Sequence, residues 1–336
     1  MGSNRLTGFG RSGITSFGVP VLPGNLPFGV DSKVFFVAPY RTETNGASDG
    51  NDGLSPKRAL RTVFGTNGAF SKCRANKNDT IVMLASGDSA SETTEDITTE
   101  QDWNKDLVHL IGTSRNKYGQ RCRFNNTGTD VTPMITISGS GCVFANFQIF
   151  CGNDDGNLVA CEVTGNHNYF ENIHFAGMGT TALAGVAGAT SLKVNGGTEN
   201  VWKDCIIGLD TIARDGDSKG ELWFDGGASR MWFEGCLFTT YLSADNQTVT
   251  VEDATGIDRT IVFKDCMFFA KSDNAATAQT TVFSIPAISQ GAIILWNTFA
   301  GTDGGAAEWD SGDRNIIWNN SVAAAVAAAG GILTTQ

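Results

Sequence analysis

Hydrophobic and polar residues alternate in one phrase that recurs between residues 139 and 322. Each copy has a Gly/polar turn, a short apolar strand, an Asn, Asp or Gly, and a second apolar strand. The copies are GSGCVFANFQIF, GNHNYFENIHF, GGTENVWKDCIIG, GGASRMWFEGCLF, TGIDRTIVFKDCMFF, GAIILWNTF and SGDRNIIWNNSV. Short apolar strands that are bounded by turn residues and repeat at a near-fixed period are typical of a solenoid, in which each coil stacks on the next.

One residue in the middle of each phrase marks its period. These anchor residues are Asn146, Asn172, Asp204, Gly235, Asp265, Asn297 and Asn319, and the steps between them are 26, 32, 31, 30, 32 and 22 residues. The sixth copy is one residue irregular, because Phe299 follows its anchor by two places and not three. Coils of two or three strands that pair in parallel, about 4.8 Å apart, make a parallel β-helix. The sequence motifs of leucine-rich repeats and of β-propellers do not occur in this sequence.

The residue after the anchor predicts what fills the interior. Cys205, Cys236 and Cys266 follow three successive anchors, so we expect their side chains to share one interior column of small apolar groups. None of the 8 cysteines belongs to a CxxC pair, which argues against a zinc ribbon. A disulfide framework is a poor fit for a chain of 336 residues, and we expect folding in a reducing cytosol.

Residues 34–84 lead into the repeats. The pattern predicts a strand over 34–39, an N-cap at Ser55, a helix over 57–64 that Gly65 and Gly68 interrupt, its resumption over 69–75, and a buried strand over 78–87. This order, with its NDGLSP loop and NDTIVML strand, resembles the corresponding segment of right-handed parallel β-helix proteins of the pectate-lyase-like superfamily. In that superfamily the helix covers the open end of the solenoid.

The resemblance and the repeats together predict an all-β fold. We expect a right-handed parallel β-helix solenoid with a short N-terminal capping helix and an extended N-terminal arm. The expected regions are an arm over 1–33, a first strand, loop and capping helix over 34–84, the parallel β-helix over 85–322 and a tail over 323–336.

The first 33 residues are rich in Gly and Pro and nearly uncharged. They fit either a floppy leader or an arm that orders on a partner. We predict the arm, with partner contacts from Arg5, Phe9, Arg11, Phe17, Val19, Val21 and Leu22. Its GFGRSGITSFGVPVLPG stretch resembles the leader of β-helix proteins encoded among bacteriophage structural genes. That resemblance implies a virion component, either a capsid decoration (cement) protein or a tail appendage, that binds the major capsid protein or another virion protein.

Net charge and hydropathy limit the kinds of partner that we expect this chain to bind. The formal charge is 24 − 35 = −11, which argues against a nucleic-acid surface. The first 30 residues lack the apolar core of a signal peptide, and no stretch approaches a membrane span. We therefore expect no nucleic acid or membrane partner, assembly in the host cytoplasm, and a final location in the virion.

Two polar segments carry candidate chemistry. Asp210, Asp215, Asp217 and Glu221 lie with Arg214 and Lys219 in one stretch, which has the residue types of a polysaccharide lyase or glycosidase or else is a solvated loop. Asp49, Asn51 and Asp52 resemble part of a calcium loop, but the twelfth place of an EF-hand would be Leu60. A looser oxygen-ligand calcium site stays an alternative, whereas the three histidines show no HExxH spacing. We expect no cofactor, no metal and no catalytic residue.

The sequence thus favours a phage structural protein, not an enzyme, and specifically a homotrimeric capsid decoration protein anchored to the shell by its arm. One alternative is a tail-appendage depolymerase, a lyase or glycosidase that cleaves host surface polysaccharide. Another is a non-catalytic fibre that binds host surface glycan through Trp232, Trp296 or Trp318, although burial in the stack is the expected state of each Trp.

Overall fold

The computed structural model describes most of the chain between residues 31 and 285. The described residues are 31–40, 46–85, 94–114, 118, 122–153, 156–244, 246–272, 279 and 282–285, together with the backbones of strands at 9–10, 13–16, 19–20, 292–300, 316–317 and 321–323. No helix in these ranges is long and apolar enough to cross a membrane.

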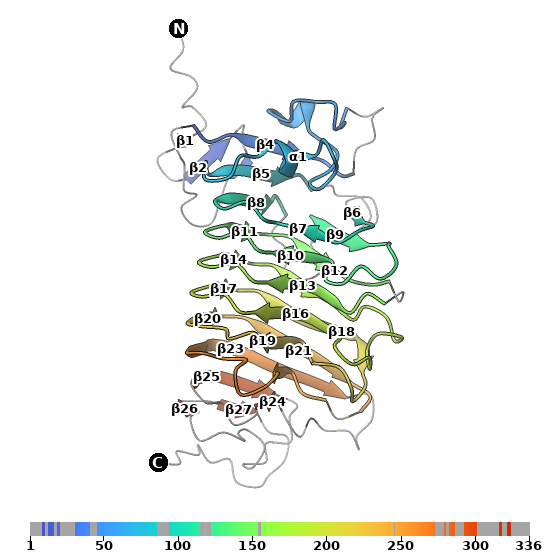
Figure 1. The fold of residues 1–336 in the computed structure, drawn as a ribbon, viewed down its shortest axis with the longest axis vertical. Coiled ribbons are helices and arrows are strands. Elements are labelled where there is room, and N and C mark those ends of the chain that lie inside the picture. The colour runs from blue at the N-terminus through green and yellow to red at the C-terminus, as the bar shows by residue number, and fades with distance from the viewer. Residues whose placement is uncertain are drawn as a thin grey trace.

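The chain winds into coils whose strands line up in three parallel stacks along one long axis (Figure 1). Stack 1 contains β4 (Val34–Val37), β5 (Asp79–Met83), β8 (Val108–Gly112), β11 (Val143–Ala145), β14 (Tyr169–Glu171), β17 (Val201–Lys203), β20 (Met231–Glu234), the first parts of β23 (Thr260–Ser272) and β25 (Ala292–Ala300), and β26 (Ile316–Ile317). Stack 2 contains β6 (Thr94–Ile97), β9 (Arg123–Asn126), β12 (Gln148–Phe150), β15 (His174–Ala176), β18 (Ile206–Arg214), β21 (Leu237–Leu242), the second parts of β23 and β25, and β27 (Ser321–Ala323).

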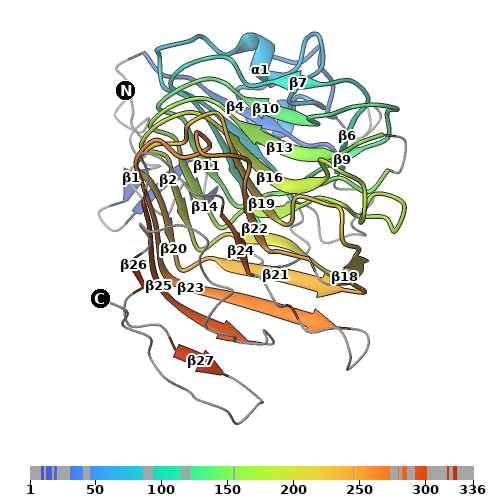
Figure 2. The same ribbon diagram turned by 60° about the horizontal axis from the view of Figure 1, so that its bottom comes forward.

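Stack 3 closes each coil and is a separate sheet (Figure 2). It contains β7 (Gln101–Asp102), β10 (Ile135–Ile137), β13 (Val159–Val163), β16 (Thr190–Asn195), β19 (Leu222–Asp225), β22 (Val249–Val251) and β24 (Phe283–Ser284). Every pairing within the three stacks is parallel. The parallel β-helix predicted from the repeats is therefore confirmed.

The anchor residues form the corner between stack 1 and stack 2. Asn146, Asn172, Asp204, Gly235 and Asp265 all have left-handed backbones, with φ between 51° and 64°. Asn and Asp tolerate this conformation better than other residues that carry a Cβ, which explains their recurrence. The Asn172 amide donates to Oδ1 of Asn146 at 2.9 Å, so the corners also hydrogen-bond from coil to coil.

The interior is built from columns of like side chains. Phe144, Phe170, Trp202, Phe233 and Phe263 stack with ring centroids 4.5 to 5.1 Å apart, which matches the parallel strand spacing of about 4.8 Å. Stacked rings of this kind maximise apolar burial in each coil.

The cysteine column is confirmed. Cys205, Cys236 and Cys266 are buried, and each thiol donates to a carbonyl oxygen of the preceding coil, at 3.7, 3.5 and 3.5 Å. Burial raises the pKa of the Cys236 thiol well above its usual value, so this sulfur stays protonated and unreactive.

The sixth copy is one residue short, as the sequence predicts. The pairing of β23 with β25 shifts at the corner, where two residues of β23 face only Asn297 of β25. The Asn297 side chain compensates, because its oxygen accepts the backbone N–H of Cys266 at 2.9 Å.

The helical cap at the first end of the solenoid is shorter than predicted. Residues 56–58 form a single 3₁₀ turn, which Ser55 precedes without a capping hydrogen bond from its hydroxyl, and α1 covers only Ala69–Lys72. The helix expected over 57–64 is therefore wrong beyond residue 58. Lys105 Nζ donates to the carbonyl oxygens of Phe70 (2.6 Å) and Cys73 (2.8 Å), and so holds the end of α1 against the first coils.

Two carboxylates explain why no helix forms between these turns. The Asp49 carboxylate accepts the backbone N–H groups of residues 61–62 at 2.9 and 3.0 Å, and Glu95 accepts those of residues 63–64 at 2.6 and 2.8 Å. Four consecutive N–H groups thus bind side chains and are not free to make helical bonds.

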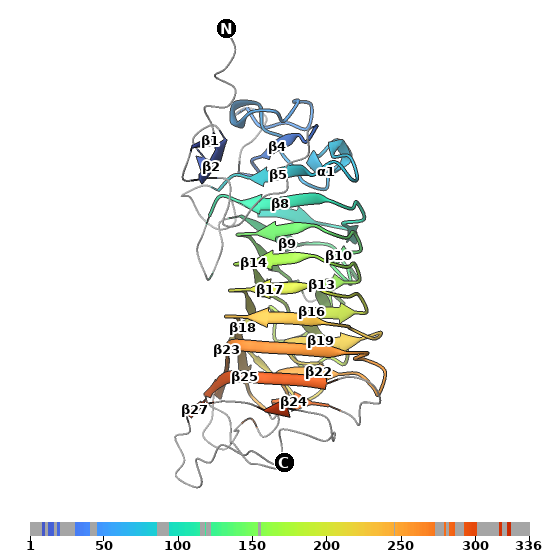
Figure 3. The same ribbon diagram turned by 90° about the vertical axis from the view of Figure 1, so that its left-hand side faces the viewer.

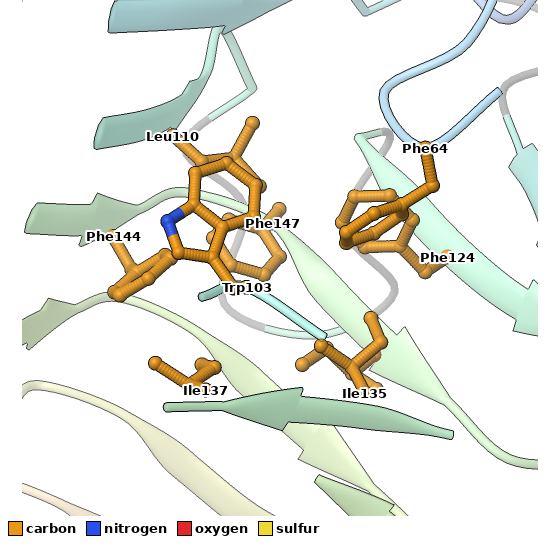
Figure 4. A pocket seen from close by; sticks show the side chains of 9 residues that line it. Phe64, Trp103, Leu110, Phe124, Ile135, Ile137, Phe144 and Phe147 are labelled. Carbon is orange, nitrogen blue, oxygen red and sulfur yellow. The ribbon is translucent and has the colours of Figure 1, made fainter. Parts of the chain in front are cut away.

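The interior below this cap is closely packed. A cavity of about 10 Å³ lies among nine apolar side chains, among them Phe64, Trp103 and Phe124 (Figure 4). Such a space is at the lower limit for one water molecule and offers it no polar partner, so it is a dry packing gap and not a ligand site.

The predicted arm contains a small sheet of its own. β1 (Phe9–Gly10), β2 (Gly13–Ser16) and β3 (Val19–Pro20) pair antiparallel in chain order, with Gly10 opposite Gly13 and Ser16 opposite Val19. Two-residue connections of this kind are typical of hairpins. The strand backbones at 9–10, 13–16 and 19–20 thus pair with one another and not with the three stacks.

Candidate functional site

The carboxylate-rich stretch over 210–221 contains a buried ion pair. Arg214, at the end of β18, donates from Nε to Oε1 of Glu221 at 2.8 Å, and both side chains have an exposed fraction of 0%. The other carboxylate oxygen of Glu221 accepts the Ser191 hydroxyl at 2.6 Å. The guanidinium also donates to the carbonyl oxygens of Gly177 (3.3 Å) and Met178 (2.8 Å). This network joins two successive coils.

The structure separates the candidate side chains of this stretch. Arg214 and Glu221 serve as internal connections and do not reach the surface. Asp215 and Asp217 are exposed, and Asp215 Oδ1 accepts the backbone N–H of Gly216 at 2.8 Å. Lys219 forms an ion pair with Glu252 at 2.7 Å. The predicted grouping of residue types is therefore divided between the interior and the solvent.

The Asp/Gly loop is also occupied by internal bonds. Besides two backbone N–H groups, Asp49 accepts the Thr62 hydroxyl at 2.6 Å. Asp52 pairs with Arg58 at 3.3 Å, and the Asn51 amide donates to the carbonyl oxygens of Gly46 and Ala59, each at 2.9 Å. Within the described ranges, no three His, Cys, Asp or Glu side chains gather as a metal site would require.

The strands of stack 1 lie one above another in Figure 3, and their outer surface is here called face 1. Face 1 carries an apolar column. The column runs through Val143, Tyr169, Val201, Trp232 and Val262, one residue per coil, all of them exposed or partly exposed. Trp232 is the most exposed residue in it, so the expectation that this Trp is buried is wrong. The burial of Trp296 and Trp318 lies outside the described residues.

A column of alternating charge flanks the apolar one on face 1. Glu171, Lys203, Glu234 and Lys264 follow one another in register, so the column is neutral overall. Trp232 Nε1 donates to Glu234 at 3.2 Å, and this bond, with the charge of Lys264, holds the pKa of Glu234 below its usual value. Tyr169 makes the equivalent bond, from its hydroxyl to Glu171 at 3.2 Å. Both aromatic rings are therefore fixed in orientation.

Face 2 is the outer surface of stack 2, across the corner from face 1. Its column runs through Gln148, His174, Ile206, Leu237 and Met267, and the first three of these are buried. Exposure rises toward the later coils. There Met267 and, two residues on, Phe269 are both exposed.

The buried His174 on face 2 has hydrogen-bond partners on both ring nitrogens. Its ring bonds the carbonyl oxygen of Gly208 at 2.9 Å and the Gln148 amide at 3.2 Å. Burial lowers its pKa to about 4, so it is neutral near pH 7. His109 is likewise buried and bonded, and its Nδ1 accepts the backbone N–H of Val143 at 3.0 Å.

The outer surface of stack 3 carries a group of ion pairs. Lys193 Nζ contacts Glu162 at 3.3 Å and Asp225 at 3.2 Å, and lies 4.2 Å from the centre of the Trp223 ring. Lys219 lies 5.3 Å from the same ring. Cations and carboxylates are thus paired from coil to coil on this surface.

The predicted arm contacts stay untested. Arg5, Arg11, Phe17, Val21 and Leu22 lie outside the described residues. Phe9 and Val19 lie in β1 and β3, of which only the backbone is described.

The fold has counterparts among solved structures. A pectin methylesterase from Aspergillus niger superposes with a TM-score of 0.53 at 14% identity, over 89% of this chain and 88% of that one. Pectin methylesterase from Erwinia chrysanthemi gives 0.50 at 12% identity, over 88% and 90%. A pectate lyase gives 0.51 at 16% identity, over 87% and 79%. At such identities the likeness shows the fold alone, and the chain thus shares the pectate-lyase-like parallel β-helix fold.

A viral protein also appears among the more distant matches. A Geobacillus virus protein has a TM-score of 0.41 at 11% identity, over 86% of this chain and 62% of that one, which is too weak a likeness to carry an argument. No known protein family matches the sequence, and no curated protein does either.

Proposed function

We propose that the chain is a structural protein of a bacteriophage particle, a homotrimeric capsid decoration protein whose arm attaches it to the major capsid protein. The observation that supports a structural role best is the Arg214–Glu221 pair. A lyase needs a basic side chain that reaches its substrate, and a glycosidase needs two carboxylates that do so. Here the most suggestive base and acid are buried against each other.

Two further features agree with this proposal. The leader sequence resembles that of phage β-helix proteins, and β1–β3 form a sheet separate from the three stacks. The outer faces of the solenoid are ladders of side chains, and ladders of this kind suit contacts with other proteins more than the enclosure of a small substrate.

Protein composition of purified particles tests the proposal. We expect the chain in mature virions, in a stoichiometry set by capsid symmetry, and a variant lacking residues 1–33 should fold but fail to attach. A chain lacking residues 323–336 serves as the matched truncation control and should still attach. Absence of the intact chain from particles would refute the virion role, and attachment without the arm would refute the anchor.

A non-catalytic glycan-binding fibre is the second candidate, because Trp232 is exposed on face 1 with its ring fixed by Glu234. Exposed aromatic rings stack on sugar faces as they do on other apolar surfaces. Glycan-array binding that is lost in Trp232→Ala, without cleavage of the glycan, would favour the fibre. Cleavage of a host polysaccharide that is lost in Asp215→Ala would favour a depolymerase instead.

A further inference from the structure

Exposed apolar side chains gather on both sides of one stretch of the corner. The described ranges contain six large apolar side chains that are well exposed, namely Leu54, Tyr118, Val186, Trp232, Met267 and Phe269. The last three, with exposed fractions of 37%, 44% and 38%, lie on two adjacent coils. Trp232 is on face 1, whereas Met267 and Phe269 are on face 2.

The strand register places these residues outside for a definite reason. β23 runs through the corner and alternates from Cys266 onward, so that Phe268 points inward and stacks on Phe238 at 4.5 Å while Met267 and Phe269 point outward. A soluble solenoid has no need of Phe at an outward position, since any polar residue would keep the inward column intact. The two patches are therefore free to serve a contact.

We propose that face 1 of one copy packs against face 2 of the next copy, with Trp232 against Met267 and Phe269, and that three copies close into a ring about an axis parallel to the solenoid. The inference rests on the homotrimer of the proposed function and names the surfaces that build it. A contact between two different patches is heterologous, and it closes into a ring when the rotation allows.

The heights of the two patches support a second copy as the occupant. Rotation about an axis parallel to the solenoid keeps every residue at its own height, so patches that meet in the ring must lie at the same level. The coils of Trp232 and Met267 are neighbours, about 4.8 Å apart along the axis. A glycan or an unrelated protein would need only one apolar patch. It would not require two patches that lie at nearly the same height on opposite sides of the corner.

Charge also permits the contact. Each copy carries a formal charge of −11, which opposes association at long range. The charged column beside Trp232 alternates Glu234 with Lys203 and Lys264, so face 1 brings no net charge to the contact. On face 2 the exposed Lys271 follows Phe269 on the side away from the corner, whereas on face 1 Glu234 lies between Trp232 and the corner, so the two charges flank opposite ends of the apolar contact.

Blocking one face at a time tests the ring. The substitution Trp232→Lys blocks face 1, Phe269→Lys blocks face 2, and Val186→Lys changes an equally exposed apolar residue elsewhere. Sedimentation equilibrium of the full chain should show a trimer for the native protein and for Val186→Lys. Each blocked variant alone should be monomeric, with an apparent association weakened by about 30-fold or more, as for loss of an aromatic hot spot.

Mixing the two blocked variants gives the decisive result. Each variant keeps the face that the other has lost, so an equimolar mixture should form a one-to-one heterodimer that cannot close. An unchanged far-ultraviolet circular dichroism spectrum and a cooperative thermal transition confirm that the variants fold, and Trp232→Ser with Phe269→Ser replace any that do not.

Several results would overturn the inference. A native monomer rejects both the trimer and its interface, including the case in which the monomer binds a glycan through Trp232. A native trimer that survives Phe269→Lys rejects the interface but keeps the trimer. Dissociation by Val186→Lys, or no heterodimer in the mixture, rejects the pairing of face 1 with face 2.

Discussion

Removing one partner of the Arg214–Glu221 pair should destabilise the solenoid strongly. In Glu221→Ala the Arg214 guanidinium stays buried and keeps its bonds to the carbonyl oxygens of Gly177 and Met178, but it loses its counter-ion at 2.8 Å. The Ser191 hydroxyl loses its acceptor at 2.6 Å at the same time. The substitution therefore leaves an uncompensated charge and an unsatisfied hydroxyl in the interior.

The size of the effect follows from the burial. Breaking a fully buried pair by removing one partner costs about 3–5 kcal/mol, whereas replacing both partners by apolar residues of similar volume is often neutral or stabilising. We expect Glu221→Ala to lose about 3–5 kcal/mol and the double variant Arg214→Met/Glu221→Leu to recover most of it. A natural domain has about 5–15 kcal/mol in total, so the single substitution removes a large share of the stability.

Urea unfolding followed by circular dichroism measures the free energies. Glu252→Ala is the matched control, because Glu252 pairs with Lys219 at 2.7 Å on the surface and should cost only about 0–1 kcal/mol. A loss of less than about 1 kcal/mol in Glu221→Ala, or a double variant as unstable as the single one, would contradict a structural role for the pair. If Glu221 were instead a catalytic acid held at a cost, its removal would raise stability.

Three further outcomes follow from single positions. We expect Trp202→Ala to lower the free energy of unfolding by about 3–5 kcal/mol, because it opens a cavity in the aromatic column. Trp232 lies one coil further on and points outward, so Trp232→Ala should change the free energy of unfolding of the monomer by less than about 1 kcal/mol. Thermal unfolding of the two variants compares these effects. Gly235→Ala should lower the free energy of unfolding by about 1 kcal/mol or more, since φ is 64° and a Cβ would meet Oδ1 of Asp204 at 2.7 Å. Asn tolerates a left-handed backbone better than Ala, so Gly235→Asn should lower it by less in the same measurement. Burial raises the pKa of Glu95 to about 7, although its two backbone N–H bonds favour the ionised form, so ionisation of Glu95 opposes folding. The free energy of unfolding should therefore fall by on the order of 3 kcal/mol as pH rises from about 4.5 through 7. If the melting temperature of Glu95→Gln changed with pH as steeply as that of the native protein, this reasoning would be refuted.

Much of the fold could be predicted from the sequence because the corner requires the same few residue types in every coil. A left-handed residue must recur there, and Asn, Asp and Gly are the residues that tolerate it. Counting from the anchor also gives the phase: the residue two places before it points inward, as Trp202 and Phe233 do, and the one three places before points outward, as Trp232 does. The prediction that Trp232 is buried was wrong because Trp232 lies three places before its anchor, at an outward position.

The third strand of each coil was harder to find. Strands such as β16 and β19 alternate polar and apolar residues, but no fixed turn residue precedes them and their distance from the corner varies. Their pairing partners lie a whole coil away in sequence, so local pattern alone does not align them.

The candidate site was predictable only by residue type. The sequence showed that acids and bases cluster over 210–221, but not that Arg214 and Glu221 turn inward while Asp215 and Asp217 face the solvent. Loop conformation decides this, and loops lack the periodicity that fixes strands. Met267 and Phe269, by contrast, lie at outward positions that the alternation in β23 already marks.

The constancy of the corner has a use in protein engineering. From Asn146 to Asp265 every coil turns through one left-handed residue, although the coils differ in length by up to six residues, from 26 to 32. Much of the variation is taken up where the chain passes from stack 2 to stack 3, and the rest where it passes from stack 3 to stack 1, as between β22 and β23. A foreign peptide grafted at residues 215–217 should thus be displayed along one edge at a small entropic cost, which grows only slowly with its length, while the register of the stacks stays intact.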